Sequence, residues 1–148
     1  MITKLLQAFL AGIFFTFILD FFLFLGIFIH YIEHYEIDLF YNILFADHQS
    51  LWLYLLLSAA LGWLTIYYAK PKETAGVLGG LFILVLLTLI PPVGEKVGSM
   101  MLMQPDQHVV AGAHIYRGDI YYSGREHIYI LDDELNEIIK LPKSQIKY

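Results

Sequence analysis

The chain has 148 residues, of which 58% are hydrophobic and only 16% are charged, and its formal net charge is −5. It contains no cysteine, which excludes disulfides, thiolate metal sites and cysteine nucleophiles. The acidic balance leaves no basic patch, so we expect no nucleic-acid partner, and the composition instead makes the lipid bilayer the first partner to consider.

The first predicted element is a long apolar helix over Leu5–Ile29. A helix needs about 20 apolar residues to cross a bilayer core, and this run is longer, so we expect it to span the membrane with some tilt. A signal peptide has an apolar region of about 7–15 residues followed by a small-residue cleavage site. The run has neither feature, and we interpret it as a retained transmembrane helix.

A connector over residues 30–50 follows and is rich in acids, histidines and aromatic residues. Its apolar residues recur at helical spacing, at Ile37, Phe40, Tyr41, Leu44 and Phe45. This pattern predicts a short amphipathic helix in the membrane interface. The alternative is a loop that its aromatic side chains hold at the interface.

The second and third apolar runs, Leu51–Tyr68 and Ala75–Pro92, predict two more transmembrane helices. The turn between them is so short that they must be antiparallel neighbours. Each run carries two small residues four apart, a spacing that lets helix backbones approach closely in lipid, so we expect these two helices to pack closely against each other. These predicted packing residues are Ser58 and Gly62 in the second run, and Gly76 and Gly80 in the third.

The tail after Pro92 changes character twice. Residues 94–107 predict a linker or short amphipathic helix, and residues 108–148 predict a small domain of antiparallel strands. The predicted fold class is therefore membrane α-helical, with a three-helix transmembrane domain over residues 1–93 followed by a small antiparallel β-meander outside the membrane.

The predicted strands are short β-branched and aromatic segments with turn residues between them. Ile115–Tyr116 and Ile120–Tyr122 are separated by Arg117–Asp119, and Ser123–Arg125 separates the latter from His127–Leu131. A turn over residues 132–136 then leads into a hairpin partner over residues 137–141, and residues 141–148 add a final short strand. About 40 residues are near the lower limit for folding alone. We therefore expect the sheet to be stabilised by packing against the membrane domain or against a partner.

The lysines predict an orientation. Lys4, Lys70 and Lys72 fall on one side of the predicted membrane, whereas the connector over residues 31–50 has no lysine or arginine. The positive-inside rule then places the N-terminus in the cytoplasm of a bacterial inner membrane and the tail in the periplasm or outside the cell. Lys96 alone opposes this orientation.

Asp20 is the one charge within the first run. A carboxylate in a transmembrane helix is costly, and it raises a functional hypothesis by default. It could relay protons or cations, or it could bind a basic residue of a partner helix. The structural alternative is an intramembrane hydrogen bond to Thr16, one turn back along the same helix.

His30, Glu33 and His34 form the pattern H-x-x-E-H, which resembles the zinc signature of the inverzincin metallopeptidases. The resemblance implies that His30 and His34 bind zinc and that Glu33 acts as a base. It covers five residues, and no downstream glutamate with the family's pattern supplies the third ligand. A non-catalytic metal site is the milder reading, and ordinary interfacial residues are the simplest one.

We therefore expect a non-enzymatic accessory, scaffold or assembly subunit of a larger bacterial inner-membrane complex, without a cofactor. Its partners would be the bilayer and either other membrane subunits or further copies of itself. The alternatives are a small proton- or cation-coupled transport subunit that uses Asp20, and a metal-dependent protein that uses His30, Glu33 and His34.

Overall fold

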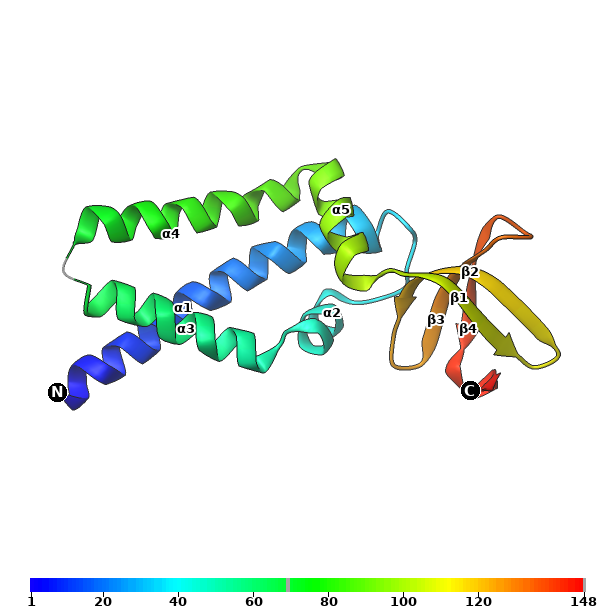
Figure 1. Cartoon of the computed structure of the whole chain (residues 1–148), viewed down its shortest axis with the longest axis horizontal. Helices are drawn as coiled ribbons and strands as arrows, with labels where there is room; N and C mark the ends of the chain where they lie inside the picture. Colours follow the sequence, from blue (N-terminus) through cyan, green and yellow to red (C-terminus); the bar gives the residue numbers. More distant parts are fainter. Residues whose placement is uncertain (69, 148) are drawn as a thin grey trace.

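The computed structural model describes residues 1–68 and 70–147. The helices lie side by side in one part of an elongated molecule, and the sheet lies beyond one end of them (Figure 1). The N-terminus and the start of α4 lie at the opposite end. In chain order the elements are α1 (Ile2–Ile27), the π-helical turn η1 (Phe28–Ile32), α2 (Tyr41–His48), α3 (Leu51–Ile66), α4 (Pro71–Leu86), η2 (Leu87–Leu89), α5 (Pro91–Leu102), β1 (Gln104–Ala111), β2 (His114–Ser123), β3 (His127–Asp132), β4 (Glu137–Pro142), η3 (Lys143–Gln145) and β5 (Ile146–Lys147).

Among residues 1–68 and 70–147, two helices are long and apolar enough to cross a membrane, Ile2–Ile32 and Pro71–Leu89. The pair α2 and α3 is bent by 83° and adds a third only if it forms one broken span. Helix α3 alone has 16 residues and is about 24 Å long, which is less than the roughly 30 Å of a bilayer core. The chain thus holds two to three helices suited to a membrane.

The closest helix pair is α1 with α3, and small residues bring the two backbones together. A Cβ atom on Gly12 would collide with the carbonyl oxygen of Ser58, and one on Gly62 would collide with the carbonyl oxygen of Ala8. Backbones this close gain many van der Waals contacts, which drive helix association in lipid. The pair Ser58 and Gly62 therefore lies on the α3 face that packs against α1, and not against the next apolar helix as the sequence predicted.

Helix α4 packs on the other side of α1 and leaves most of its own surface exposed. The rings of Phe22 and Phe82 meet edge to face at a centroid distance of 5.4 Å. At the end of α4, the Thr88 hydroxyl donates to the Val85 carbonyl at 2.7 Å, and Thr88 backs directly onto Gly26. The contact thus occurs at isolated positions along one side of α4.

Helix α5 crosses the end of the bundle and connects it to the sheet (Figure 1). Its first residue is Pro91, at a position where a missing N–H costs nothing. The proline therefore starts a new helix after α4 has already ended in η2. Gly94 backs onto the Thr88 carbonyl, and Gly98 lies against the ring of Tyr31, so two glycines let α5 approach the bundle closely, while Leu102 on the same face enters the core.

The predicted 94–107 segment is divided between two elements. Helix α5 ends at Leu102 and strand β1 begins at Gln104, so the strand starts before His108. Its first residues are polar and exposed, so they lack the alternation of apolar residues that predicts a strand. Pro105 is tolerated because β5 covers β1 only at Val110 and Ala111, so the edge beside the proline is free of described strands.

In the described part of the chain, five strands form one antiparallel sheet in the order β4-β3-β2-β1-β5. The predicted antiparallel meander is confirmed, as is the hairpin of β3 with β4, in which Ile128 faces Leu141 and Asp132 faces Glu137. The Asp132 carboxylate accepts hydrogen bonds from the amides of Glu134 and Leu135, at 2.9 and 3.0 Å, and so closes the predicted turn.

One predicted turn is wrong. Residues 117–119 do not separate two strands but lie inside β2, where Gly118 pairs with Asp132 of β3. Gly118 has φ +151° and lies directly over the Leu131 carbonyl, so it allows the strand to bend without ending. The turn before β2 occurs at Gly112, which has φ +62°.

The sheet and the helices share a core. Buried residues from α1, η1, the connector, α5 and the sheet form a single cluster, which comprises Phe24, Ile27, Tyr31, Ile32, Ile37, Leu44, Leu102, Tyr122 and Tyr129. The last turns of α1 are therefore surrounded by protein. This packing explains why the first apolar run is longer than a bilayer requires, because its end is core rather than lipid-facing helix.

Candidate functional site

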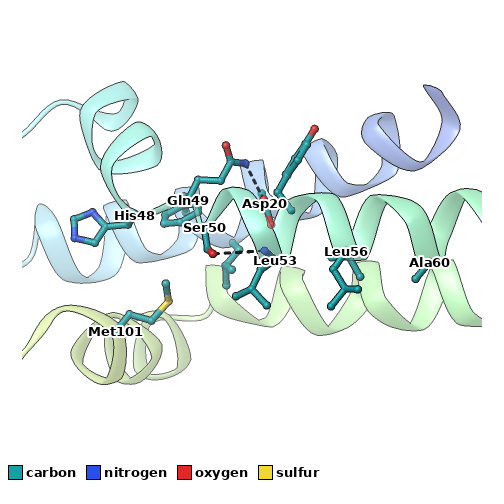
Figure 2. Close-up of a pocket in the computed structure, with 12 residues that line it drawn as sticks. Asp20, His48, Gln49, Ser50, Leu53, Leu56, Ala60 and Met101 are labelled. Atoms are coloured by element: carbon teal, nitrogen blue, oxygen red, sulfur yellow. Dashed lines mark hydrogen bonds between the residues drawn. The ribbon is translucent and has the colours of Figure 1, made fainter. Parts of the chain in front are cut away.

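Asp20 and the bend between α2 and α3 bring polar side chains together within the apolar helices. The chain passes from α2 to α3 through Gln49 and Ser50, both in extended backbone conformation. The Gln49 amide donates to the Asp20 carboxylate at 2.9 Å (Figure 2). The Ser50 hydroxyl accepts a long hydrogen bond of 3.5 Å from the Leu53 amide and caps α3. The bend thus places polar side chains beside Asp20, the one acid in α1.

A pocket of about 480 Å³ opens beside Asp20. This volume lies within the range of small-molecule sites, which are mostly apolar with a few polar groups. Figure 2 shows the lining side chains, which come from α1, the bend, α3 and α5. They are Asp20, Leu23, Phe24, His48, Gln49, Ser50, Leu53, Tyr54, Leu56, Leu57, Ala60 and Met101.

The pocket has a polar end and an apolar end. Its polar side chains gather around Asp20 and the bend, whereas Leu56, Leu57 and Ala60 continue along α3 as an apolar wall. Leu53 is 67% exposed and Leu56 is 70% exposed, so the pocket is open along α3. If α3 lies in the membrane, this opening faces lipid.

In the structure Asp20 is hydrogen-bonded to Gln49 and not to Thr16, the partner predicted within its own helix. The Thr16 hydroxyl is fully buried and makes no hydrogen bond to any described residue. Gln49, from a distant part of the sequence, bonds Asp20 instead. The polar triplet His48–Ser50 just before an apolar run was the signal that could have pointed to it.

The H-x-x-E-H residues do not converge. The ring of His30 lies 2.8 Å from the Leu89 carbonyl and so ties the end of α1 to the end of α4. His34 packs instead against the ring of Tyr35, at a centroid distance of 4.8 Å. In residues 1–68 and 70–147 no three His, Asp or Glu side chains are placed to hold a metal ion. The geometry therefore gives no support to a metal site at His30, Glu33 and His34.

The second predicted glycine pair is placed differently from the first. A Cβ atom added to Gly76, Gly79 or Gly80 would meet no described atom within 4 Å. These glycines share the exposed side of α4 with large apolar residues. Among the latter, Ile83 and Leu84 are each 62% exposed. We call this surface, which comprises Gly76, Gly80, Ile83, Leu84 and Leu87, the α4 glycine face.

Polar contacts fasten the sheet to the connector. The Arg125 guanidinium forms a two-pronged ion pair with the Asp47 carboxylate. The Lys140 ammonium lies 3.2 Å from the Asp38 carboxylate. These contacts bridge the connector and the strands at the surface of the junction.

A tyrosine cluster supports the same junction. The Tyr31 hydroxyl donates to the Tyr121 carbonyl at 2.7 Å, and the rings of Tyr35 and Tyr121 stack at 4.5 Å. The Tyr35 hydroxyl donates to Glu95 at 2.6 Å. Burial, together with this carboxylate, raises the pKa of Tyr35 above its ordinary value, because both disfavour the phenolate.

No known protein family matches this chain, and no curated protein or solved structure shows significant similarity to it.

Proposed function

We propose that this chain is a non-enzymatic accessory subunit, with a scaffold or assembly role, of a larger bacterial inner-membrane complex. In this proposal α1, the bent pair α2–α3, and α4 cross the membrane, and the sheet lies on the extracytoplasmic side. The α4 glycine face binds a transmembrane helix of another subunit. The observation that carries the proposal is the contrast between this face and the chain's other helix contacts.

Elsewhere in the bundle, close-packed glycines face backbone or side chains of a neighbouring element. Gly12 and Gly62 join α1 to α3, Gly26 meets Thr88, and Gly98 receives Tyr31. The glycines of α4 follow the same small-residue spacing without a described neighbour. A helix that approached there would gain the same close backbone contact. Exposed leucine and isoleucine on that face would widen the interface.

Replacing Gly80 with leucine tests the partner surface. Because the added side chain meets no described atom, we expect the chain to fold and insert normally, yet to lose its partner. Gentle detergent extraction followed by native mass measurement should find the wild-type chain in a heteromeric complex, and at least tenfold less complex for Gly80→Leu. Ala59→Leu, on the exposed surface of α3, is the matched control and should leave the complex intact.

Two results would contradict the proposal. A wild-type chain extracted as a lone monomer would remove the role as a complex subunit. A defined homo-oligomer would instead favour a transport subunit, because several copies would be needed to enclose a path past Asp20.

The orientation has support from the fold. Lys4, Lys70 and Lys72 belong to the end of the bundle away from the sheet, where the N-terminus and the start of α4 lie together (Figure 1). Positive charge collected at one end favours the cytoplasm for that end. The sheet then faces the periplasm or the exterior.

Cysteine labelling tests this orientation, since the chain has no cysteine of its own. Ser144 is exposed in the sheet domain, and Lys72 is exposed at the start of α4. In intact spheroplasts, Ser144→Cys should react with an impermeant maleimide, and Lys72→Cys should react only after lysis. The reversed pattern would place the sheet in the cytoplasm.

A further inference from the structure

The pocket beside Asp20 runs along the first half of α3. From Leu53 to Ala60 its wall on α3 covers about 10 Å along the helix axis. Half of a bilayer core is about 15 Å thick, so this wall can follow the part of an acyl chain nearest its head group. The polar end lies at the α2–α3 bend, where α3 begins, and α3 is too short for a full span. The apolar end runs toward the middle of the bundle. The polarity therefore follows that of a lipid, with its head at the bend.

The charge at the polar end selects the head group. Asp20 is the only carboxylate among the described residues that line the pocket, and no described lysine or arginine lines it. A head group with only negative charge would meet the Asp20 carboxylate, and His48 is the one lining side chain among the described residues that can carry a positive charge. A primary ammonium would find the Asp20 carboxylate as its ionic partner and the Ser50 hydroxyl as a further acceptor in the lining.

We propose that this pocket binds one membrane phospholipid with a primary-amine head group, its ammonium at Asp20 and one acyl chain along Leu53, Leu56 and Ala60. The openness of the pocket along α3 lets a lipid enter sideways from the bilayer. This proposal goes beyond the role as a complex subunit and does not depend on it, because the pocket lies between α1, α3 and α5 rather than on the α4 glycine face.

Lipid retention by the full chain tests the proposal. The protein is purified from bilayers with equal parts of phosphatidylethanolamine, phosphatidylcholine and phosphatidylglycerol, and bound lipid is identified by native mass spectrometry. We expect one phosphatidylethanolamine per chain, preferred about tenfold over either competitor, since a charge-assisted hydrogen bond supports a factor of that size. Equal retention of the three lipids, or none of any, would overturn the proposal.

Two variants locate the site. Asp20→Asn keeps the shape and should abolish the preference for the amine while retaining the lipid. Ala60→Phe fills the apolar end of the pocket and should abolish lipid retention altogether. Leu56→Trp fills the pocket from a second exposed position and should have the same effect. The control Ala59→Phe places the same ring on the neighbouring exposed residue, outside the pocket, and should retain phosphatidylethanolamine as the wild type does.

Circular dichroism establishes that each variant is folded before its bound lipid is identified. A folded Asp20→Asn protein with an unchanged preference, or folded Ala60→Phe and Leu56→Trp proteins that still carry the lipid, would rule out this pocket. The result is separate from that of the complex measurement, because Gly80→Leu should lose its partner and keep its lipid.

Discussion

Replacing Gly62 with leucine is expected to separate α1 from α3 and to destabilise the native fold strongly. The Cβ atom of any larger residue would overlap the Ala8 carbonyl oxygen, which belongs to a helix backbone and cannot rotate away. Overpacking a well-packed contact costs about 1–3 kcal/mol when side chains can adjust, and here the obstruction is backbone. The cost should therefore be at the top of that range or above it.

Thermal unfolding of the purified chain in detergent, followed by circular dichroism, measures this effect. Gly80→Leu is the matched control, because it makes the same change at a glycine with no described atom within 4 Å of its added Cβ. The control should melt close to the wild type, and Gly62→Leu should melt many degrees lower or fail to accumulate. Equal melting of the two variants would show that the α1–α3 contact is looser than described.

Gly118→Ala should have the second largest effect, and it should act on the sheet. Gly118 has φ +151°, a conformation that residues with a Cβ atom adopt at a cost of about 1–3 kcal/mol. Its Cβ would also collide with the Leu131 carbonyl oxygen across the β2–β3 pair. We expect loss of the hydrogen bonds between β2 and β3 around this position, with the helices left in place.

Hydrogen exchange read by mass spectrometry resolves this local change. Peptides from β2 and β3 should exchange faster in Gly118→Ala, while peptides from α1 and α3 stay protected. Gly112→Asn is the control, since Gly112 has φ +62°, lies in open space, and asparagine accepts that conformation. Its sheet should remain protected. Uniformly faster exchange in Gly118→Ala would mean that the sheet and the bundle unfold together.

Local patterns in the sequence predicted the elements that depend on short-range physics. Apolar runs predicted the helices, because burial in lipid needs only length and hydrophobicity. The β3–β4 hairpin followed from two β-rich segments around the Asp132 turn, and it is confirmed in the pairing of Ile128 with Leu141. The start of β1 was missed, since exposed polar residues such as Gln104 carry no strand pattern.

The candidate site could be predicted only in part. Asp20 stood out because a charge in an apolar helix has no local explanation. Its partner Gln49 and the pocket beside it come from the α2–α3 bend, which brings distant residues to the same level of the bundle. The two glycine pairs likewise have the same spacing in the sequence, yet only one of them faces a described helix.

The sequence by itself determined which segments suit a membrane, that an antiparallel meander follows them, and that one acid lies within an apolar helix. These properties depend on composition and periodicity over a few turns of chain. Only the tertiary structure decided what each group contacts: that the end of α1 is protein core, that Asp20 bonds Gln49 beside an open pocket, and that a Cβ atom added to Gly76 or Gly80 would meet no described atom within 4 Å. The physical reason is that contact depends on how helices cross, and crossing depends on shape at many distant positions at once.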